Sequence, residues 1–545
     1  MRWVRRIGSS WPAWLFLLSA AFSIWIAFDR STAWARFLLV ALAVAVYAAI
    51  AYVPDRIKIG RRSVSPLHAA FGVLPVVIVL LSLVASDWSS RIGKLAWLDP
   101  AVRWLDAWQS GLTETVIHPN VIGGALAMLI PLQLTALSGW RKSHPWLWAA
   151  LLGLSLLALV VTESRGAWLA LAMTGVLWAS WKLVMRVATR RRASPRVAKT
   201  AWILAVAAIC TATAAALVLT PLGERLLSLR SDREVVWRNS LDLISDYPLT
   251  GIGLGSFEMA YSSYVLLVHV GHTTHAHNLL LDVWLNLGIL GLAAMAGLAG
   301  TAFRACPAQP WTPAAFASCG VVLLHGLVDD AYLGYGGAGV VLLLIPFALL
   351  ARSADQPDGA PARATRFWPA AAAATAVLLF AVAVLAIPSL RARVLANLGA
   401  VAQTQAELSV YRWPDWPIQD ALRQSSEVDL APAIARYEEA LTIEPSDATA
   451  NRRLGQVEMA RLQYDTACVH LVAAHAAALY QRATRQLLGE CAAMRGDVQT
   501  AAELWRGIDL GNGQLDARRW WYAEYLHDPV RATQLHKAQA ALGPN

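Results

Sequence analysis

Long apolar segments recur along the first 390 residues of the chain. Each holds roughly 18 to 25 residues with few charges, the length that an α-helix needs to cross about 30 Å of hydrocarbon. The first segment follows Arg2, Arg5 and Arg6 like a signal peptide, but it has no clear small-residue cleavage site, so we expect it to be retained. The pattern predicts an all-α, polytopic membrane protein with about eleven transmembrane helices. The expected spans lie near 12–28, 35–53, 67–86, 119–139, 145–162, 167–185, 201–220, 278–303, 311–327, 334–350 and 368–388.

The composition supports a membrane protein. Apolar residues make up 57% of the chain, charged residues 15%, and the mean hydropathy is +0.46. Soluble domains carry about 25% charged residues. The net charge of +10 is compatible with a nucleic-acid partner, but in a membrane protein the positions of Lys and Arg matter more than their sum. We therefore predict no nucleic-acid partner.

Lys and Arg gather in alternate connections between the predicted spans. They occur at 54–66, 141–142, 186–199 and 352–366. The positive-inside rule places these loops in the cytoplasm, together with the N-terminus. After an odd number of spans the C-terminus then lies outside, and so do the long loops 87–118 and 221–277, where function in membrane enzymes tends to reside.

The outer loop 87–118 contains three tryptophans, Trp97, Trp104 and Trp108, spaced for one face of a helix. This favours an interfacial helix that lies flat on the outer leaflet. A packed loop helix is nearly as consistent with the spacing.

The chain after residue 390 is more charged and contains no predicted span. Leu454-Gly455 recurs as Leu488-Gly489, and Ala433, Ala467 and Ala501 are each 34 residues apart. Tyr437, Ala440 and Pro445 are placed as in a tetratricopeptide helix pair. We predict a transmembrane domain at 1–390 and an extracytoplasmic, tetratricopeptide-like domain of helical hairpins at 391–545, able to recruit a protein partner. The last unit, around Trp520 to Leu535, fits the repeat poorly and is interpreted as a cap.

The five cysteines form no close motif, and only Cys468 and Cys491 fall in the predicted outer domain. A disulfide between them is consistent with that location, but two buried thiols are the favoured interpretation.

Arg165, in Thr162-Glu163-Ser164-Arg165-Gly166, is a cation on the predicted outer side, against the charge bias. One interpretation is a snorkelling side chain paired with Glu163. The favoured one is an anion site at the membrane surface, because an ionisable group at a membrane boundary is a functional candidate.

The outer loop 221–277 contains a second set of candidates. A capping box formed by Ser231 and Glu234 opens a helix on which Arg233, Trp237 and Ser240 share one face, while Arg238 points elsewhere. A solvated surface arginine is the alternative for Arg233. Glycines then alternate between 247 and 257, and no βαβ unit surrounds them, so they indicate a structural turn that returns the loop to the membrane.

Four histidines, His269, His272, His275 and His277, end this loop. No nearby carboxylate or cysteine completes a zinc site, so we predict no metal and no other cofactor. Imidazole titrates near neutrality, which suits His277 to general-base work. Asn278 is expected to orient the imidazole or to bind a sugar hydroxyl.

Taken together, these outer motifs resemble the O-antigen ligase and polymerase superfamily over roughly residues 67–350. The matching motifs are His118-Pro119-Asn120, Ser164-Arg165-Gly166-Ala167-Trp168-Leu169, Arg233 with Trp237, Pro248 to Phe257, His275-Ala276-His277-Asn278-Leu279 and Leu287-Gly288-Ile289-Leu290-Gly291. The resemblance implies a glycosyltransferase of a bacterial inner or cytoplasmic membrane that uses an undecaprenyl-diphosphate-linked saccharide. It also implies that Arg165 and Arg233, with Arg238 as a further candidate, bind the donor diphosphate, and that His277 activates the acceptor hydroxyl, with His275, Asn278 and Trp237 in support.

The residues also fit this chemistry by themselves. Two Arg groups can balance the charge of a leaving diphosphate, while His277 deprotonates an attacking hydroxyl on the opposite face of the sugar, which inverts the anomeric centre.

A ligase is the first choice, with a glycan, lipid or protein acceptor. A polymerase and a protein O-oligosaccharyltransferase fit the same residues. A transporter or flippase is disfavoured, because the sequence shows neither mid-span charges nor inverted repeats. An inactive scaffold is disfavoured because Arg165, Arg233 and His277 occur together.

Overall fold

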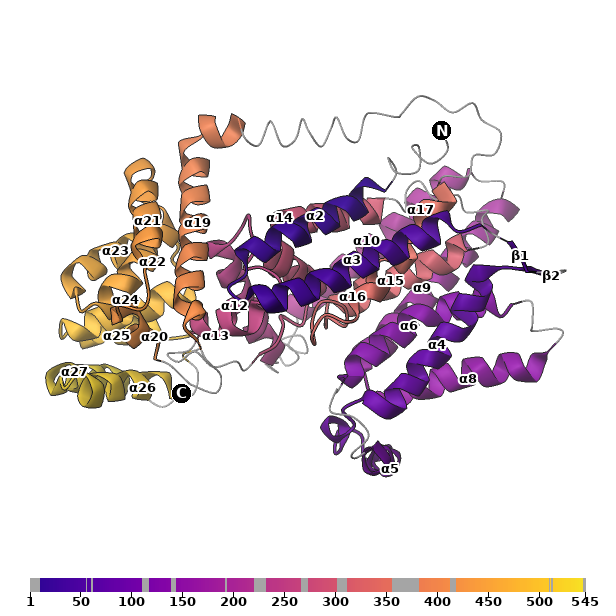
Figure 1. Ribbon diagram of the computed structural model, residues 1–545, viewed down its shortest axis with the longest axis horizontal. Helices are drawn as coiled ribbons and strands as arrows, with labels where there is room; N and C mark the ends of the chain where they lie inside the picture. Colours follow the sequence, from indigo (N-terminus) through magenta and orange to yellow (C-terminus); the bar gives the residue numbers. More distant parts are fainter. Residues whose placement is uncertain are drawn as a thin grey trace.

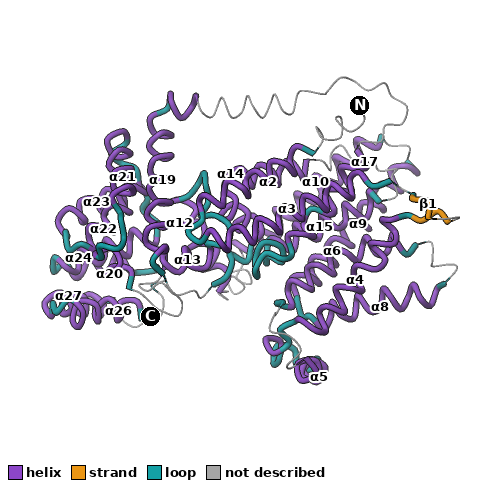
Figure 2. Tube along the Cα trace, in the orientation of Figure 1, coloured by secondary structure: helices purple, strands orange, loops and turns teal. Residues whose placement is uncertain are grey.

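The structure is a computed structural model, and it describes residues 10–54, 56–59, 62–109, 117–138, 144–191, 194–219, 232–265, 273–300, 311–354, 382–411, 418–508, 510 and 513–542. Helices dominate this part of the chain (Figures 1 and 2). Its strands are β1 (Ile57–Ile59) and β2 (Arg62–Val64), a short antiparallel hairpin that pairs Lys58 with Ser63.

Most helices of the N-terminal part are apolar. They are α2 (Trp11–Ile26), α3 (Arg30–Tyr52), α4 (Pro66–Ala85), α6 (Pro119–Ala136), α8 (Pro145–Val161), α9 (Arg165–Arg190), α10 (Pro195–Leu219), α14 (Leu279–Gly300), α15 (Thr312–Gly326), α16 (Val340–Leu343) and α17 (Ile345–Ala354). Among the described residues, α3, α4, α6, α9 and α14 are long and apolar enough to cross a membrane, and five shorter apolar helices accompany them. The all-α, polytopic prediction is thus confirmed. The number eleven is not established, because most of the span expected near 368–388 lies outside the described residues.

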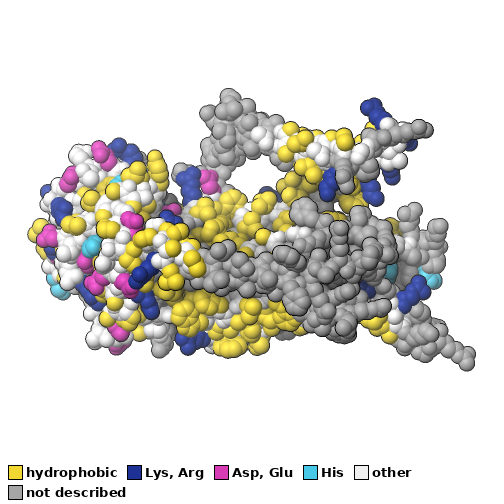
Figure 3. Space-filling view, turned by 90° about the horizontal axis from the view of Figure 1, so that it is seen from above, with side chains coloured by type: hydrophobic (Ala, Val, Ile, Leu, Met, Phe, Trp, Pro, Cys, Tyr) yellow, Lys and Arg dark blue, Asp and Glu magenta, His cyan; other side chains and the backbone are white. Residues whose placement is uncertain are grey.

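The apolar helices bury very different fractions of their surface. In its most apolar window α6 is 83% buried within the protein, whereas α9 is 11% buried. Helix α6 therefore lies at the centre of the bundle, and α9 leaves its apolar side chains for lipid. A broad hydrophobic surface covers the helices in Figure 3, while charged side chains of both signs gather over the C-terminal helices.

Small residues let α6 approach its neighbours near its N-terminus. A Cβ added at Gly123 would lie 2.6 Å from Cβ of Ser164, and one added at Gly124 would lie 2.9 Å from Cε1 of His325. These two glycines bring the N-terminus of α6 against the turn that precedes α9 and against the end of α15. Three segments that are distant in sequence therefore meet at one end of the bundle.

Four further helices lie at the end of the bundle where α6 begins. They are η1 (Ser89–Arg91), α5 (Asp99–Gln109), α12 (Asp232–Asp246) and α13 (Phe257–Val265). The exposed side chains Trp97, Trp104 and Trp108 belong to α5 and the turn before it, while Val102 and Leu105 are buried. Helix α5 thus packs on the protein through Val102 and Leu105, which fits a packed loop helix as well as an interfacial one, and the interfacial helix stays a prediction.

The glycine-rich turn after α12 docks on a kink in α14. Gly251 and Gly288 have φ of 63° and 66°, and a Cβ on either would meet backbone atoms of the other segment. The Ile252 amide donates to the carbonyl of Leu285 at 2.7 Å, and that of Ile289 donates to Leu249 at 3.1 Å. The glycines thus form the structural turn that the sequence predicts, because only glycine allows this backbone conformation and approach without strain.

The C-terminal part is an array of helices that starts with α19 (Pro388–Ser409) and α20 (Gln419–Gln424). It continues with α21 (Ala431–Ile443), α22 (Ala448–Ala460), α23 (Tyr464–Ala477), α24 (Arg482–Met494), α25 (Val498–Trp505), α26 (Gln514–Trp520), η3 (Trp521–Tyr525) and α27 (Pro529–Ala541). The repeated alanines Ala433, Ala467 and Ala501 are buried at equivalent places in this array. Helical hairpins are therefore present, and their assignment to the tetratricopeptide family stays a prediction.

Cys468 of α23 and Cys491 of α24 form a disulfide, with their Cα atoms 5.8 Å apart. The interpretation as two buried thiols was therefore wrong. Packing of α23 against α24 brings the two cysteines into bonding geometry, which the spacing of 23 residues does not reveal.

The helical array binds the C-terminal end of α12 through a buried cluster of charged side chains. The Asp246 carboxylate, at 0% exposure, accepts from Arg452 and from Arg453 Nε, the latter at 2.9 Å. The side-chain oxygen of Asn397 in α19 accepts from the Leu249 and Thr250 amides. Figure 1 shows α12 and α13 between the array and the apolar helices.

Asp246→Ala is expected to destabilise the folded protein by about 3–5 kcal/mol, because it leaves two buried guanidinium groups without their carboxylate. The measurement is thermal unfolding in detergent, together with protease cleavage between the two parts. Glu439→Ala is the matched control, since Glu439 pairs with Arg391 on the surface and such pairs contribute about 0–1 kcal/mol. Equal effects of both substitutions would contradict the structural role of the cluster.

Candidate active site

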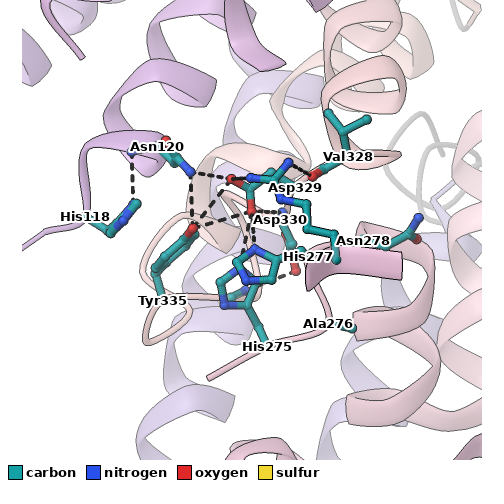
Figure 4. A network of polar contacts seen from close by, with 12 residues as sticks. His118, Asn120, His275, Ala276, His277, Asn278, Val328, Asp329, Asp330 and Tyr335 are labelled. Atoms are coloured by element: carbon teal, nitrogen blue, oxygen red, sulfur yellow. Dashed lines mark hydrogen bonds and ion pairs between the residues drawn. The ribbon is translucent and has the colours of Figure 1, made fainter. Parts of the chain in front are cut away.

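Asp329, in the segment between α15 and α16, is the centre of a polar network (Figure 4). Its Oδ1 lies 3.0 Å from Nδ1 of His277 and 3.3 Å from Nε2 of His275. Its Oδ2 accepts from the side-chain amide of Asn120 and lies 3.6 Å from a guanidinium nitrogen of Arg233. Asp329 is 2% exposed, so these four side chains replace the water that a carboxylate otherwise requires.

Two further carboxylates hold the loops that carry the network. Asp282 of α14 accepts from the Ala276 amide at 2.9 Å, which fixes the backbone between the two histidines. Asp330 accepts from the amides of Tyr332, Leu333 and Gly334 and so folds the turn that follows Asp329.

Backbone strain concentrates at this site. Five non-glycine residues of the described chain have positive φ, and three of them, Glu163, His277 and Tyr335, lie here with φ of 52°, 51° and 46°. Such conformations cost about 1–3 kcal/mol each and persist where the surrounding structure fixes them. The three therefore mark a site whose geometry is constrained by packing.

His277 and His275 differ in access to solvent. The side chain of His277 is 26% exposed, whereas that of His275 is 2% exposed. The indole of Trp237 donates to the His277 carbonyl at 3.3 Å and anchors its backbone. When Nδ1 of His277 donates its proton to Asp329, Nε2 carries the free lone pair that a general base needs. Of the two histidines, only His277 combines this arrangement with an open face.

Asp329 is held in its charged form. Burial alone would raise the pKa of this carboxyl, but hydrogen bonds from His275 and His277 outweigh it and keep the pKa well below its ordinary value.

An aromatic stack closes the other side of the network. The ring of Tyr335 stacks on that of His118, with centroids 4.2 Å apart, and contacts that of His275 at 4.1 Å. Burial and the neighbouring charge of Arg91 lower the pKa of His118 to about 4. His118 is therefore neutral near pH 7, and Nδ1 of its side chain accepts from the Asn120 amide at the start of α6.

Four cationic side chains, of Arg91, Lys94, Arg165 and Arg233, lie near the network. Arg233 donates to the Val328 carbonyl, and Arg165 donates to that of Lys94 at 3.4 Å. Arg91 is 3% exposed and donates to Asn120 Oδ1 at 2.8 Å. Partial burial and the positive charges of Arg91, Arg165 and Arg233 lower the pKa of Lys94, so Lys94 lies within electrostatic reach of all three arginines. Such a cluster favours an anion.

The alternative that pairs Arg165 with Glu163 is not what the structure shows. Within the described residues Arg165 makes no ion pair with Glu163, and both carboxylate oxygens of Glu163 are buried without a hydrogen-bond partner. Burial raises the pKa of Glu163. The guanidinium of Arg165 is exposed and available to a ligand.

Two of the predicted site residues lie apart from the network. Arg238 pairs with Glu234 at 2.8 Å on the surface, with 66% of its side chain exposed. Asn278 caps α14 by accepting from the Leu280 and Leu281 amides, and it donates to the Leu327 carbonyl. Figure 4 shows its side chain directed away from Asp329. Ser231, His269 and His272 lie outside the described residues.

Sequence reasoning did not single out Asp329, Arg91 or Tyr335. Arg91 violates the same charge bias as Arg165, since both are cations on the predicted outer side, so that signal was available. Asp329 follows an apolar helix as part of an acidic pair, a weaker signal. Nothing local in the sequence marks Tyr335.

The fold brings a carboxylate, that of Asp329, to His275 and His277, although no carboxylate lies near these histidines in the sequence. One ligand atom each from His275, His277 and Asp329 lies within 4.8 Å of the others, so the three could hold an ion. However, Arg233 lies 3.6 Å from the same carboxylate, and a fixed positive charge there opposes a bound cation. The residues therefore fit an imidazole base paired with a carboxylate better than a zinc centre.

Part of the chain is similar in sequence to known proteins. Residues 149–296 match the model of the O-antigen ligase family. A curated O-antigen ligase of Salmonella typhimurium strain LT2 is 26% identical over 238 residues, which cover 40% of this chain and 52% of that protein. The chain thus spans about half the length of this relative. No solved structure matches. With its apolar helices the chain is a multi-pass membrane protein, and its residues 149–296 are similar to the O-antigen ligase family.

Proposed function

We propose that this protein is a metal-independent glycan ligase that moves a saccharide from a polyprenyl diphosphate to an acceptor hydroxyl on the extracytoplasmic face of a bacterial inner membrane. One observation carries the proposal. The partly exposed imidazole of His277 pairs with the buried carboxylate of Asp329, and four cationic side chains lie nearby, at one end of the apolar helix bundle. The sequence relative is named as an O-antigen ligase, which agrees with this chemistry.

In the proposed reaction the donor diphosphate binds Arg165 and Arg233, with Lys94 adding positive charge. Nε2 of His277 takes the proton of the acceptor hydroxyl, whose oxygen forms a bond to the anomeric carbon. The bond from that carbon to the diphosphate oxygen breaks, and the diphosphate leaves with the electron pair. The cations stabilise this leaving charge, and Asp329 stabilises the imidazolium that forms. Attack opposite the leaving group inverts the anomeric configuration.

The direct experiment incubates purified protein with a defined polyprenyl-diphosphate-linked glycan and with lipid, glycan and protein acceptors. Formation of an inverted glycosidic bond without added metal or nucleotide is the expected result. The acceptor that is used separates a ligase from a polymerase, which joins two lipid-linked units, and from a protein O-oligosaccharyltransferase. Absence of transfer to all three acceptor classes would contradict the proposal.

Orientation is part of the proposal, and the disulfide supports it. The Cys468–Cys491 bond forms in oxidising compartments and is rare in the cytosol. Arg352 donates to the carbonyls of Ile50 and Val53 at the C-terminal end of α3. The first turns of α3 lie against Gly255, which connects α12 to α13, so Arg352 lies at the other end of α3, as the positive-inside rule favours.

Cysteines placed at exposed positions in the helical array are expected to react with membrane-impermeant maleimide in cells whose outer envelope is permeabilised. Thr442→Cys is suitable, because this side chain is exposed on α21. Arg190→Cys is the opposite control and should react only after the inner membrane is opened. If the cysteine at position 442 stayed unlabelled while the inner membrane was intact, the helical array would lie in the cytoplasm and extracytoplasmic chemistry would be excluded.

Arg165→Lys and Arg233→Lys are expected to lose most transfer activity although both keep the charge. A planar guanidinium can bind two diphosphate oxygens at once, and an ammonium does not reproduce that geometry. Each change should lower kcat/KM by about tenfold or more, the effect of roughly 1.4 kcal/mol of lost binding. Arg238→Lys is the matched control, because Arg238 pairs with Glu234 on the same helix. Equal losses at 165, 233 and 238 would argue against a specific diphosphate site.

A further inference from the structure

Asn120 belongs to the network around Asp329, but the proposed reaction gives its side chain no role. The residue is buried in the first turn of α6, where its backbone amide donates to Nδ1 of His118 at 3.2 Å. Figure 4 shows the side chain extending from α6 toward Asp329 and Tyr335. Burial and the anchored backbone therefore fix where the amide group of Asn120 lies.

The side chain of Asn120 uses both of its hydrogens and its oxygen. Its Oδ1 accepts from a terminal guanidinium nitrogen of Arg91 at 2.8 Å. Its Nδ2 donates to Oδ2 of Asp329 and to the hydroxyl oxygen of Tyr335, the latter at 3.2 Å. Leucine and an ionised aspartate are similar in size, but leucine makes none of these bonds and a carboxylate cannot donate. The contacts at position 120 therefore require an amide group.

Arg91 fixes the direction of this amide. An amide keeps nearly the same shape when its oxygen and nitrogen exchange places, so packing alone does not decide which of them faces Asp329. A guanidinium only donates hydrogen bonds, so it must face the oxygen. Arg91 is 3% exposed, and its hydrogen bonds within the described residues go to Asn120 and, at 3.4 Å, to His118 rather than to a carboxylate. This buried cation therefore turns the NH₂ group of Asn120 toward Asp329.

The two carboxylate oxygens of Asp329 face different partners. Oδ1 faces His275 and His277, whereas Oδ2 accepts from Asn120 and lies 3.6 Å from Arg233. On the function proposed above, Arg233 also binds the donor diphosphate. When its guanidinium turns to the donor, Asn120 still holds Oδ2, and a carboxylate held at Oδ2 keeps Oδ1 in line with Nδ1 of His277.

We propose that Asn120 is a positioning residue that holds the Asp329 carboxylate in line with His277, while Arg91 keeps the amide of Asn120 in the direction that this requires. The alignment of the imidazole rests on the contacts around Asp329. Its consequence for the rate of transfer rests on the proposed function, in which His277 is the base.

The test uses Asn120→Leu in the full-length protein in detergent. Its kcat for transfer should fall about ten- to a hundredfold, the effect of a lost hydrogen bond to a charged group. KM for the lipid donor should change little, because Arg165 and Arg233 are kept. Diethyl pyrocarbonate modifies unprotonated imidazoles, and its reaction with His277, followed by mass spectrometry of the modified peptide, should slow several-fold. This second measurement does not need transferase activity.

Asn120→Asp tests whether a hydrogen-bond donor at this position is what Asp329 needs. When two neighbouring carboxyls share a proton, the protonated one donates to the other. At acidic pH this variant should therefore be more active than Asn120→Leu. The other charged or titratable groups that face the pair are the same in both variants, so their own titration cancels in the comparison: Arg91, Arg233, His118, His275, His277 and Tyr335.

Asn286→Leu is the matched control. Asn286 is a buried asparagine of α14 whose Oδ1 accepts from the Gly255 amide at 3.2 Å and whose Nδ2 donates to the Asp282 carbonyl at 2.8 Å. The change removes similar hydrogen bonds without touching Asp329. It should lower the thermal stability but leave kcat and the reactivity of His277 unchanged. Asn120→Ala takes the place of Asn120→Leu if the larger side chain prevents folding.

Unchanged reactivity of His277 in Asn120→Leu would overturn the proposal, and so would an Asn120→Asp variant that is no more active than Asn120→Leu at any pH. Equal losses in Asn286→Leu would show an effect of stability and would also overturn it. Slower modification of His277 in a protein without transferase activity would refute the proposed function and leave the alignment standing. Transfer activity with unchanged reactivity in Asn120→Leu would refute the alignment alone.

Discussion

His277→Ala is expected to lower the rate of glycan transfer by about 10²- to 10⁴-fold, the usual contribution of a general base. Binding of the lipid donor should persist, because the cations proposed to bind the diphosphate lie on other segments. The measurement is single-turnover transfer at saturating donor, together with donor binding measured separately. On acidification Asp329, with its lowered pKa, should stay charged and keep its contact with His277.

His275 provides the comparison within the same loop. The side chain of His275 is 2% exposed and contacts the Asp329 carboxylate. His275→Ala should therefore lower the transfer rate less than His277→Ala, because it acts only through that carboxylate. A zinc site would instead make both histidines and Asp329 equally sensitive, and a chelator would abolish activity that zinc restores. That result, or full activity with alanine at 277, would refute the assignment of His277 as the base.

Asp329→Asn is expected to lower transfer on the order of 10²-fold, within the range of general-base effects. An asparagine has nearly the same shape, but it carries no charge to stabilise the imidazolium, and its amide can present a donor to Nδ1. His277 would then carry its proton on Nε2, where the acceptor hydroxyl needs a lone pair. The loss should appear in kcat more than in KM, because the substitution acts on proton transfer.

A double variant separates this role from a purely structural one. If Asp329 acts through His277, the variant with both His277→Ala and Asp329→Asn should be no slower than His277→Ala alone. Multiplied losses would show that Asp329 works through another route, such as the position of Arg233. Thermal unfolding of each variant checks that the fold is kept, since Asp329 is buried and joins four segments.

Local patterns determined much of the architecture. Apolar runs predict most of the described apolar helices close to their observed places, because burial in lipid requires length and hydrophobicity, which are properties of contiguous sequence. The run expected to span at 334–350 instead forms α16 and α17, which begin at residue 340. The glycines between 251 and 255 predict a turn for a similar reason, since their conformational freedom is local. Arg165, Arg233 and His277 were likewise visible in the sequence, as cations and an imidazole in segments predicted to lie outside.

Tertiary structure alone decided which of these residues meet. Asp329 is 52 residues from His277 and 209 from Asn120, and only the packing of α6, α14 and α15 brings their side chains together. Packing at this end of the bundle also buries Arg91, and packing of α23 against α24 closes the disulfide. Contacts of this kind depend on the relative positions of helices that are distant in sequence, which no periodicity within one helix records.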